Sequence, residues 1–72
     1  MDAVVKEKIE KILYGEIRYT SANLAFNMMI SKMQKRLKAN SVDMETCMKE
    51  MEEFLAKYPI VAKVDLANIA AL

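Results

Sequence analysis

Residues 21–57 decide the fold, and their sequence is SANLAFNMMISKMQKRLKANSVDMETCMKEMEEFLAK. Apolar residues recur every three or four positions in both halves of this stretch, which is the spacing of an amphipathic helix. The first half predicts a helix over about 21–38, capped by Thr20 or Ser21, and the second half predicts a helix over about 42–57. Because the connection between them is short, we expect the two helices to be antiparallel.

These two segments hold six of the seven methionines, whose flexible thioether side chains suit a small core or an adaptable binding groove. The main apolar stripe of the first segment comprises Ala22, Phe26, Met29, Ile30, Met33 and Leu37. The stripe of the second segment comprises Met44, Cys47, Met48, Met51, Phe54, Leu55 and Tyr58. Leu24 and Met28 lie nearly opposite the first stripe. The first of these helices is therefore either the central helix of a bundle or the carrier of an exposed contact patch.

A further helix is predicted at the N-terminal side, over about 2–14. Its apolar stripe comprises Val5, Ile9, Ile12 and Leu13. Asp2 suits the start of this helix as a cap, and Gly15 is the natural place for it to end. Residues 16–20 alternate apolar and polar side chains, so the pattern leaves open a short strand, a helical turn or a continued, kinked helix.

The C-terminal tail, residues 60–72, has only two charged residues and many apolar ones. Pro59 ends the preceding helix, because proline cannot continue the hydrogen-bond ladder. Two interpretations of the tail remain: Asp65 caps a short helix over 66–72, or Pro59 is the first residue of one longer helix. In either case the tail must bury its apolar side chains, across its own bundle or on a second chain.

The single glycine and single proline argue against a sheet, which needs repeated tight turns. We therefore expect an all-α protein in which residues 1–72 form a single helical domain: a small three-helix bundle with a short C-terminal helical tail.

Several chemistries are not expected from this chain. There is no histidine to act as a general base, and one glycine cannot build a phosphate-binding loop. Cys47 has no histidine partner and lies on an apolar stripe, where a thiol is inert. Met44, Cys47, Met48 and Met51 are soft ligands suited to copper(I), but a core stripe requires the same positions. We expect no enzyme activity, no cofactor and no metal.

The compartment is predicted to be the cytoplasm. The first eleven residues are charged and lack the apolar stretch of a signal peptide, and no apolar run approaches the length of a transmembrane helix. A lone cysteine fits a reducing compartment. The predicted N-terminal helix mixes acids with lysines on its polar face, so a membrane-surface role is not expected either.

A hydrophobic content of 54% is high for a chain of 72 residues, and one protomer has little interior in which to hide it. The charges are also divided, at +4 over residues 1–38 and −3 over residues 39–72, so opposite halves attract within or between protomers. We expect a protein–protein interaction module, an adaptor or regulatory protein that forms a homodimer or binds a helical protein partner. The candidate partner-binding residues are Leu24, Met28, Val64, Leu66 and Ile69.

The alternative is a nucleic-acid-binding accessory protein. Its candidate residues, Lys32, Lys35, Arg36 and Lys38, crowd the end of the helix over 21–38. A helix C-terminus also attracts cations through its own dipole, so this cluster has a structural explanation too. The helix over 42–57 carries mostly acidic charges that DNA would repel, so any binding would come from the basic cluster and be weakly sequence-specific.

Overall fold

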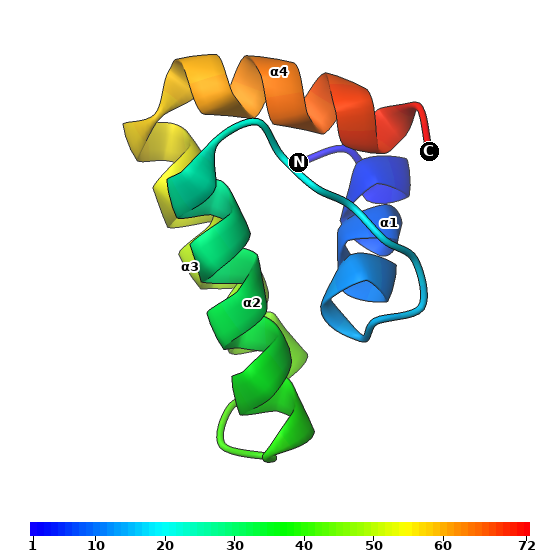
Figure 1. Ribbon diagram of the computed structural model, residues 1–72, viewed down its shortest axis with the longest axis vertical. Coiled ribbons are helices and arrows are strands. Elements are labelled where there is room, and N and C mark those ends of the chain that lie inside the picture. Colours follow the sequence, from blue (N-terminus) through cyan, green and yellow to red (C-terminus); the bar gives the residue numbers. More distant parts are fainter.

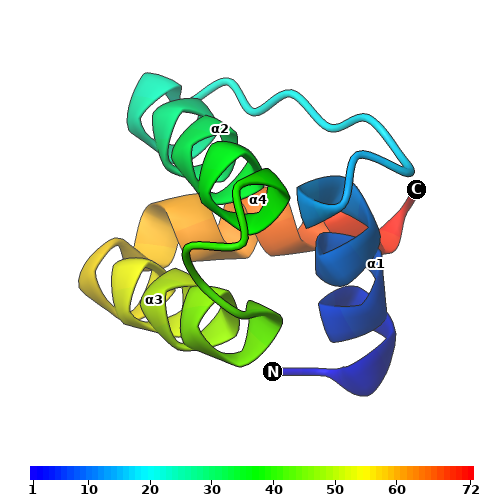
Figure 2. The ribbon, with the colours of Figure 1, turned by 90° about the horizontal axis from the view of Figure 1, so that it is seen from below.

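The computed structural model describes residues 1–72 and contains four helices and no strand. The helices are α1 (Ala3–Leu13), α2 (Leu24–Lys38), α3 (Met44–Lys57) and α4 (Pro59–Ala70). Figure 1 shows α2 and α3 as an antiparallel hairpin, with α4 crossing the upper end of the hairpin and α1 lying beneath the far half of α4. Viewed from below, α1 lies on one side of the hairpin and leaves the opposite side uncovered (Figure 2). The all-α class is confirmed, but the expected short tail is a helix of 12 residues, longer than α1.

The ends of α1 follow the sequence signals closely. The Asp2 carboxylate accepts hydrogen bonds from the backbone N–H groups of Val4 and Val5, at 2.8 and 3.3 Å, and so satisfies two otherwise unpaired donors. At the other end Gly15 adopts a φ of 78°, which a residue without a Cβ reaches at no steric cost. The amide of Glu16 then reaches back to the carbonyl of Lys11 and closes a Schellman-type end.

The start of α2 differs from the prediction. The helix begins at Leu24, and its cap is Asn23, whose side chain accepts from the N–H of Phe26 at 3.0 Å, so the prediction of Thr20 or Ser21 as the cap was wrong. Asn27 reaches back from the helix, bonding both the N–H and the C=O of Ser21 at 2.8 Å. These two hydrogen bonds keep Ser21 in the extended connection before the helix. Ala22, which was expected on the apolar stripe, also lies before the helix and is exposed.

The connection between α1 and α2 runs without helix or strand through residues 16–20 and lies against α4. Tyr19 is its anchor, because the hydroxyl donates to the carboxylate of Asp65, a residue only 2% exposed in the middle of α4. The interpretation of Asp65 as a helix cap was therefore wrong, and the alternative that Pro59 begins one longer helix is confirmed. Pro59 is well placed there, since the first helical position needs no intrahelical N–H donor.

Twelve apolar side chains form one core cluster. They are Val5, Ile9, Ile12, Leu13, Phe26, Ile30, Met33, Cys47, Met48, Met51, Leu55 and Ile69. All four helices contribute, and α4 packs most closely on α1 and α3 while α1 also packs on α2. Ile69 is fully buried, so the tail covers the core of its own chain. Met33, Met48 and Met51 fill this core, whereas Tyr58, expected on the α3 stripe, is half exposed.

Candidate protein interface

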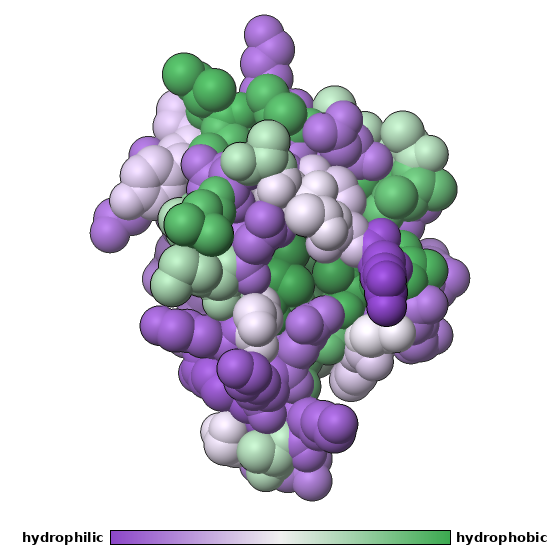
Figure 3. Space-filling view, viewed as in Figure 1, coloured by the Kyte–Doolittle hydropathy of each residue, from purple (hydrophilic) through white to green (hydrophobic).

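The uncovered side of the hairpin carries large apolar side chains at its upper end. We define the corner patch as Leu24, Met28, Tyr58 and Ile60, which are 73%, 54%, 50% and 79% exposed. Leu24 and Met28 are one turn apart on α2, whereas Tyr58 and Ile60 flank the proline that joins α3 to α4. In Figure 3, hydrophobic surface gathers at this upper corner and again along the right edge of the molecule, whereas the lower part of the hairpin is mostly hydrophilic.

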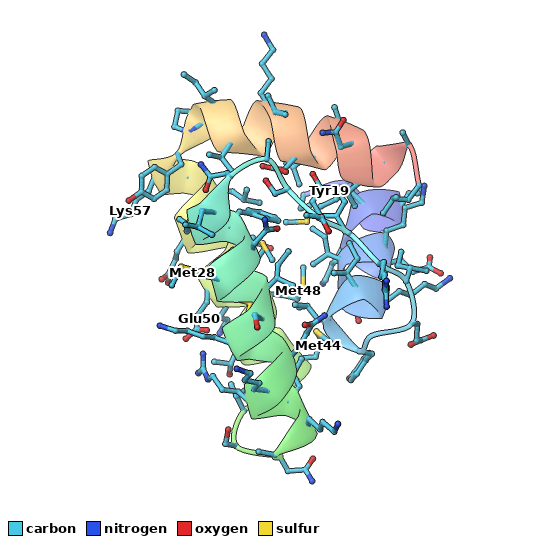
Figure 4. The ribbon with its side chains drawn as sticks, in the orientation of Figure 1. Tyr19, Met28, Met44, Met48, Glu50 and Lys57 are labelled. Carbon is cyan, nitrogen blue, oxygen red and sulfur yellow. The ribbon has the colours of Figure 1, made fainter.

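An open groove of about 790 Å³ runs between α2 and α3 next to this patch. Its lining residues are Ala25, Met28, Met29, Lys32, Met33, Arg36, Glu50, Glu53, Phe54, Ala56 and Lys57. Phe54 links the groove to the interior, because its ring packs edge-on against the buried Phe26 at a centroid distance of 5.9 Å. Figure 4 shows Met28, Glu50 and Lys57 along this side of the hairpin, whereas Met44 and Met48 lie between the hairpin and α1. The groove is thus apolar in its upper part and charged along its rims.

One ion pair crosses the lower end of the groove. Arg36 Nη1 lies 2.8 Å from Glu50 Oε2, and Arg36 Nη2 lies 3.4 Å from Glu50 Oε1. The hydrogen bond to Glu50 raises the pKa of the Arg36 guanidinium above its ordinary value. Lys32 and Glu53 line the same groove, but neither forms an ion pair within the chain. Lys57 lines the groove as well and is also unpaired, so the groove has one neutralised charge pair and three rim charges without a partner.

The predicted partner-binding residues fall in four different places. Leu24 and Met28 lie together on the uncovered side, about 40° apart around α2. Val64 is 49% exposed on the outer side of α4. Leu66 is half-buried and lines a smaller hollow with Val5 and Leu55. Ile69 is fully buried in the core, so it is not available on the surface of this chain.

The basic cluster of the nucleic-acid alternative is spread broadly over one side of α2. At about 100° per residue, Lys32, Lys35, Arg36 and Lys38 spread over roughly 160° of the α2 circumference. Arg36 is paired with Glu50, which leaves the three lysines as free cations. The acidic side chains of α3 lie directly across the groove from Lys32 and weaken the positive field there.

The cysteine and the buried methionines belong to the core. Cys47 has no exposed surface, and burial raises the pKa of its thiol above the usual range, as expected for an unreactive side chain. Met48 and Met51 are buried beside it, and Met44 is half-buried. No cluster of three or more histidine, cysteine, aspartate or glutamate side chains has the geometry to hold a metal ion.

Sequence reasoning missed part of the surface site. Tyr58 was assigned to the core stripe of α3 but is half exposed, and Ile60 lies in the tail, whose apolar side chains were expected to be buried on its own bundle or on a second chain. The signal for Ile60 was present, because a helix that starts at Pro59 places Ile60 and Val64 about 140–180° from the buried Ile69.

None of the four helices combines the length and apolar character needed to cross a bilayer. The chain matches no protein-family model, no curated protein and no solved structure.

Proposed function

We propose that this chain is a small helical protein–protein interaction module that self-associates through the α2–α3 groove and the corner patch. The observation that carries the proposal is the exposure of Leu24 and Met28, 73% and 54%, beside an open groove with an apolar upper part. Apolar side chains gathered on one rim of a groove are typical of protein-binding surfaces. A methionine at such a surface suits the docking of one helix face into the groove of another, because its side chain repacks easily.

The size of the patch indicates the strength of association. Full burial of a leucine, isoleucine, methionine or aromatic side chain is worth about 1.5–3 kcal/mol. Weighted by their exposed fractions, the four corner-patch residues supply about 6 kcal/mol per chain, or about 12 kcal/mol for two copies. Association costs at least about 4 kcal/mol in lost freedom, so a dissociation constant no tighter than the micromolar range is expected.

The test is the molar mass in solution, measured by light scattering across a concentration series that spans the micromolar range. Wild type should move from the 8.2 kDa monomer toward twice that mass as concentration rises. Leu24→Glu should remain a monomer, because it places a charge in the apolar part of the interface. Tyr14→Glu is the matched control, since Tyr14 is 60% exposed at the far end of α1 and its replacement should leave the dimer intact. A wild-type protein that stays at 8.2 kDa throughout would refute self-association.

The nucleic-acid alternative is supported by one observation, which is that Lys32, Lys35 and Lys38 have no ion-pair partner in the chain. If it holds, wild type binds RNA or DNA at about 50 mM salt with a strong salt dependence. Neutralising Lys32, Lys35 and Arg36 together should then weaken binding and flatten that dependence. Absence of binding by wild type at this salt concentration would remove the alternative.

A further inference from the structure

The two helices that border the groove carry opposite charge. α2 holds four basic residues and no acidic one, whereas α3 holds four acidic residues and two basic ones. This division constrains how a second copy fits on the groove, and the inference drawn from it rests on the proposed self-association. Dimers of identical chains are commonly related by a two-fold axis, which presents the same surface from both copies.

Two orientations of that axis bring the hairpins face to face. An axis perpendicular to the helices and within the interface places α2 on α2 and α3 on α3. Each helix then faces a helix of the same charge in the other copy. An axis parallel to the helices places α2 of each copy on α3 of the other, so basic meets acidic twice. Like charges brought together disfavour the first orientation, and complementary charges favour the second.

The Arg36–Glu50 pair fixes the heights of the remaining charges along the groove. Lys32 lies four residues above Arg36 on α2, which is about 6 Å along the axis. Glu53 lies three residues above Glu50 on the antiparallel α3, which is about 4.5 Å. A two-fold axis parallel to the helices preserves height, so Lys32 of one copy comes level with Glu53 of the other.

The geometry points to a homodimer in which α2 of each copy packs on α3 of the other, with Lys32 paired to Glu53 across the interface at two symmetric places. Both side chains line the groove, and neither has an ion-pair partner in its own chain. In the same register Met28 comes level with Tyr58 of the second copy. The corner patch of each copy then packs against the corner patch of the other. Charge pairing thus sets the orientation, and the apolar corner supplies most of the affinity.

The area available fits a weak dimer. A stable interface buries about 800 Å² per partner, roughly one-sixth of the 4911 Å² surface of this chain. The 15-residue α2 is about 22 Å long, and a helix pair is about 20 Å wide, so the face of the hairpin projects to about 450 Å². That projection is about half of the standard area per partner, which is the size of a weak interface and is in line with the micromolar dissociation constant expected above.

Charge reversal tests the arrangement. Lys32→Glu and Glu53→Lys should each weaken the homodimer at low salt by at least about tenfold, because each creates two like-charge contacts. An equimolar mixture of the two variants should form a heterodimer of near wild-type affinity, since both interfacial pairs are then attractive again. Lys32→Glu combined with Glu53→Lys in one chain should restore the homodimer. Each variant should keep the wild-type melting curve at monomeric concentration, because neither side chain is paired within the chain.

Lys35→Glu is the matched control, because it makes the same change on the same helix outside the groove and should leave the dissociation constant within a few fold. The arrangement is overturned if the single reversals dimerise like this control, or if their mixture and the double variant stay as weak as the singles. If Leu24→Glu still abolishes the dimer in that case, self-association stands and only the orientation is wrong. A monomeric wild type would overturn both.

Discussion

Replacing Ile69 by alanine should cost the protein a large part of its stability. Ile69 is fully buried where α4 meets the core, and the substitution removes three carbon atoms. The lost transfer free energy is about 2.4 kcal/mol at about 0.8 kcal/mol per buried carbon, and the cavity left behind raises the loss to about 3–4 kcal/mol. A 72-residue domain has a free energy of unfolding of about 4–10 kcal/mol. The variant should therefore unfold at a clearly lower urea concentration than wild type.

The assay is urea unfolding followed by circular dichroism, with all variants at the same protein concentration because a dimer would make stability concentration-dependent. Val64→Ala is the control on the same helix, since Val64 is 49% exposed and its truncation should cost less than about 1 kcal/mol. At roughly 4–8 °C per kcal/mol, the melting temperature of Ile69→Ala should fall by more than about 12 °C. If Ile69→Ala loses no more than Val64→Ala, α4 does not belong to the core and its placement is wrong.

Three further predictions concern the loop anchor, the α2 cap and the thiol. Burial and then the hydrogen bond to Asp65 raise the pKa of Tyr19 from 10.0 to about 12, so folding favours the protonated hydroxyl. The contribution of the Tyr19 hydroxyl to the free energy of unfolding is complete below pH 10 and is lost as the pH rises toward about 12. Urea titrations over this pH range should show the loss in wild type and in Tyr14→Phe but not in Tyr19→Phe. Asn23→Ala should lower the free energy of unfolding by about 1 kcal/mol in the same assay, and an unchanged value would contradict its role as the cap. Cys47 should react with a thiol reagent only as fast as the chain unfolds, and rapid labelling of the folded protein would show that the core is open to solvent.

Local signals predicted α1 and α3 well, because each has a cap, a single apolar stripe and a clear stop. Asp2 caps the start of α1 and Gly15 follows its end, as the sequence indicates. Asp43 caps α3 by accepting a hydrogen bond from the N–H of Thr46 at 2.8 Å. The start of α2 was less predictable, because Thr20, Ser21 and Asn23 are all acceptable caps. The choice depends on the side chain of Asn27, which bonds Ser21 from one turn inside the helix.

The placement of α4 could not be derived from periodicity. Apolar side chains lie all around this helix, with Ile60 and Val64 outward, whereas the charged Asp65 faces inward. A helix without a polar side gives no indication of which side is buried. Asp65 is accommodated only because Tyr19, 46 residues earlier in the chain, donates a hydrogen bond to it. Such a contact is set by tertiary structure and leaves no local pattern.

The candidate interface was predictable only in part, because helical spacing places residues around one helix but does not align two helices. Leu24 and Met28 oppose the main apolar stripe of α2, which left open a central helix or an exposed contact patch. The structure leaves both side chains on the uncovered side. The groove exists only because α3 lies beside α2, and the alignment of the two helices sets the height of Glu53 relative to Lys32. Helical spacing on one helix contains no information about that register, so the charge pair proposed between copies emerges only from the fold.

The most direct test of self-association through the groove is an isotope-filtered NOE experiment on a sample that mixes labelled and unlabelled chains. This experiment detects only contacts between copies, and methionine methyl groups are well suited to it. We expect intermolecular contacts from the Met28 methyl group to the aromatic rings of Phe54 and Tyr58. Contacts confined to α1, or a concentrated sample with no intermolecular contact, would contradict self-association through this groove.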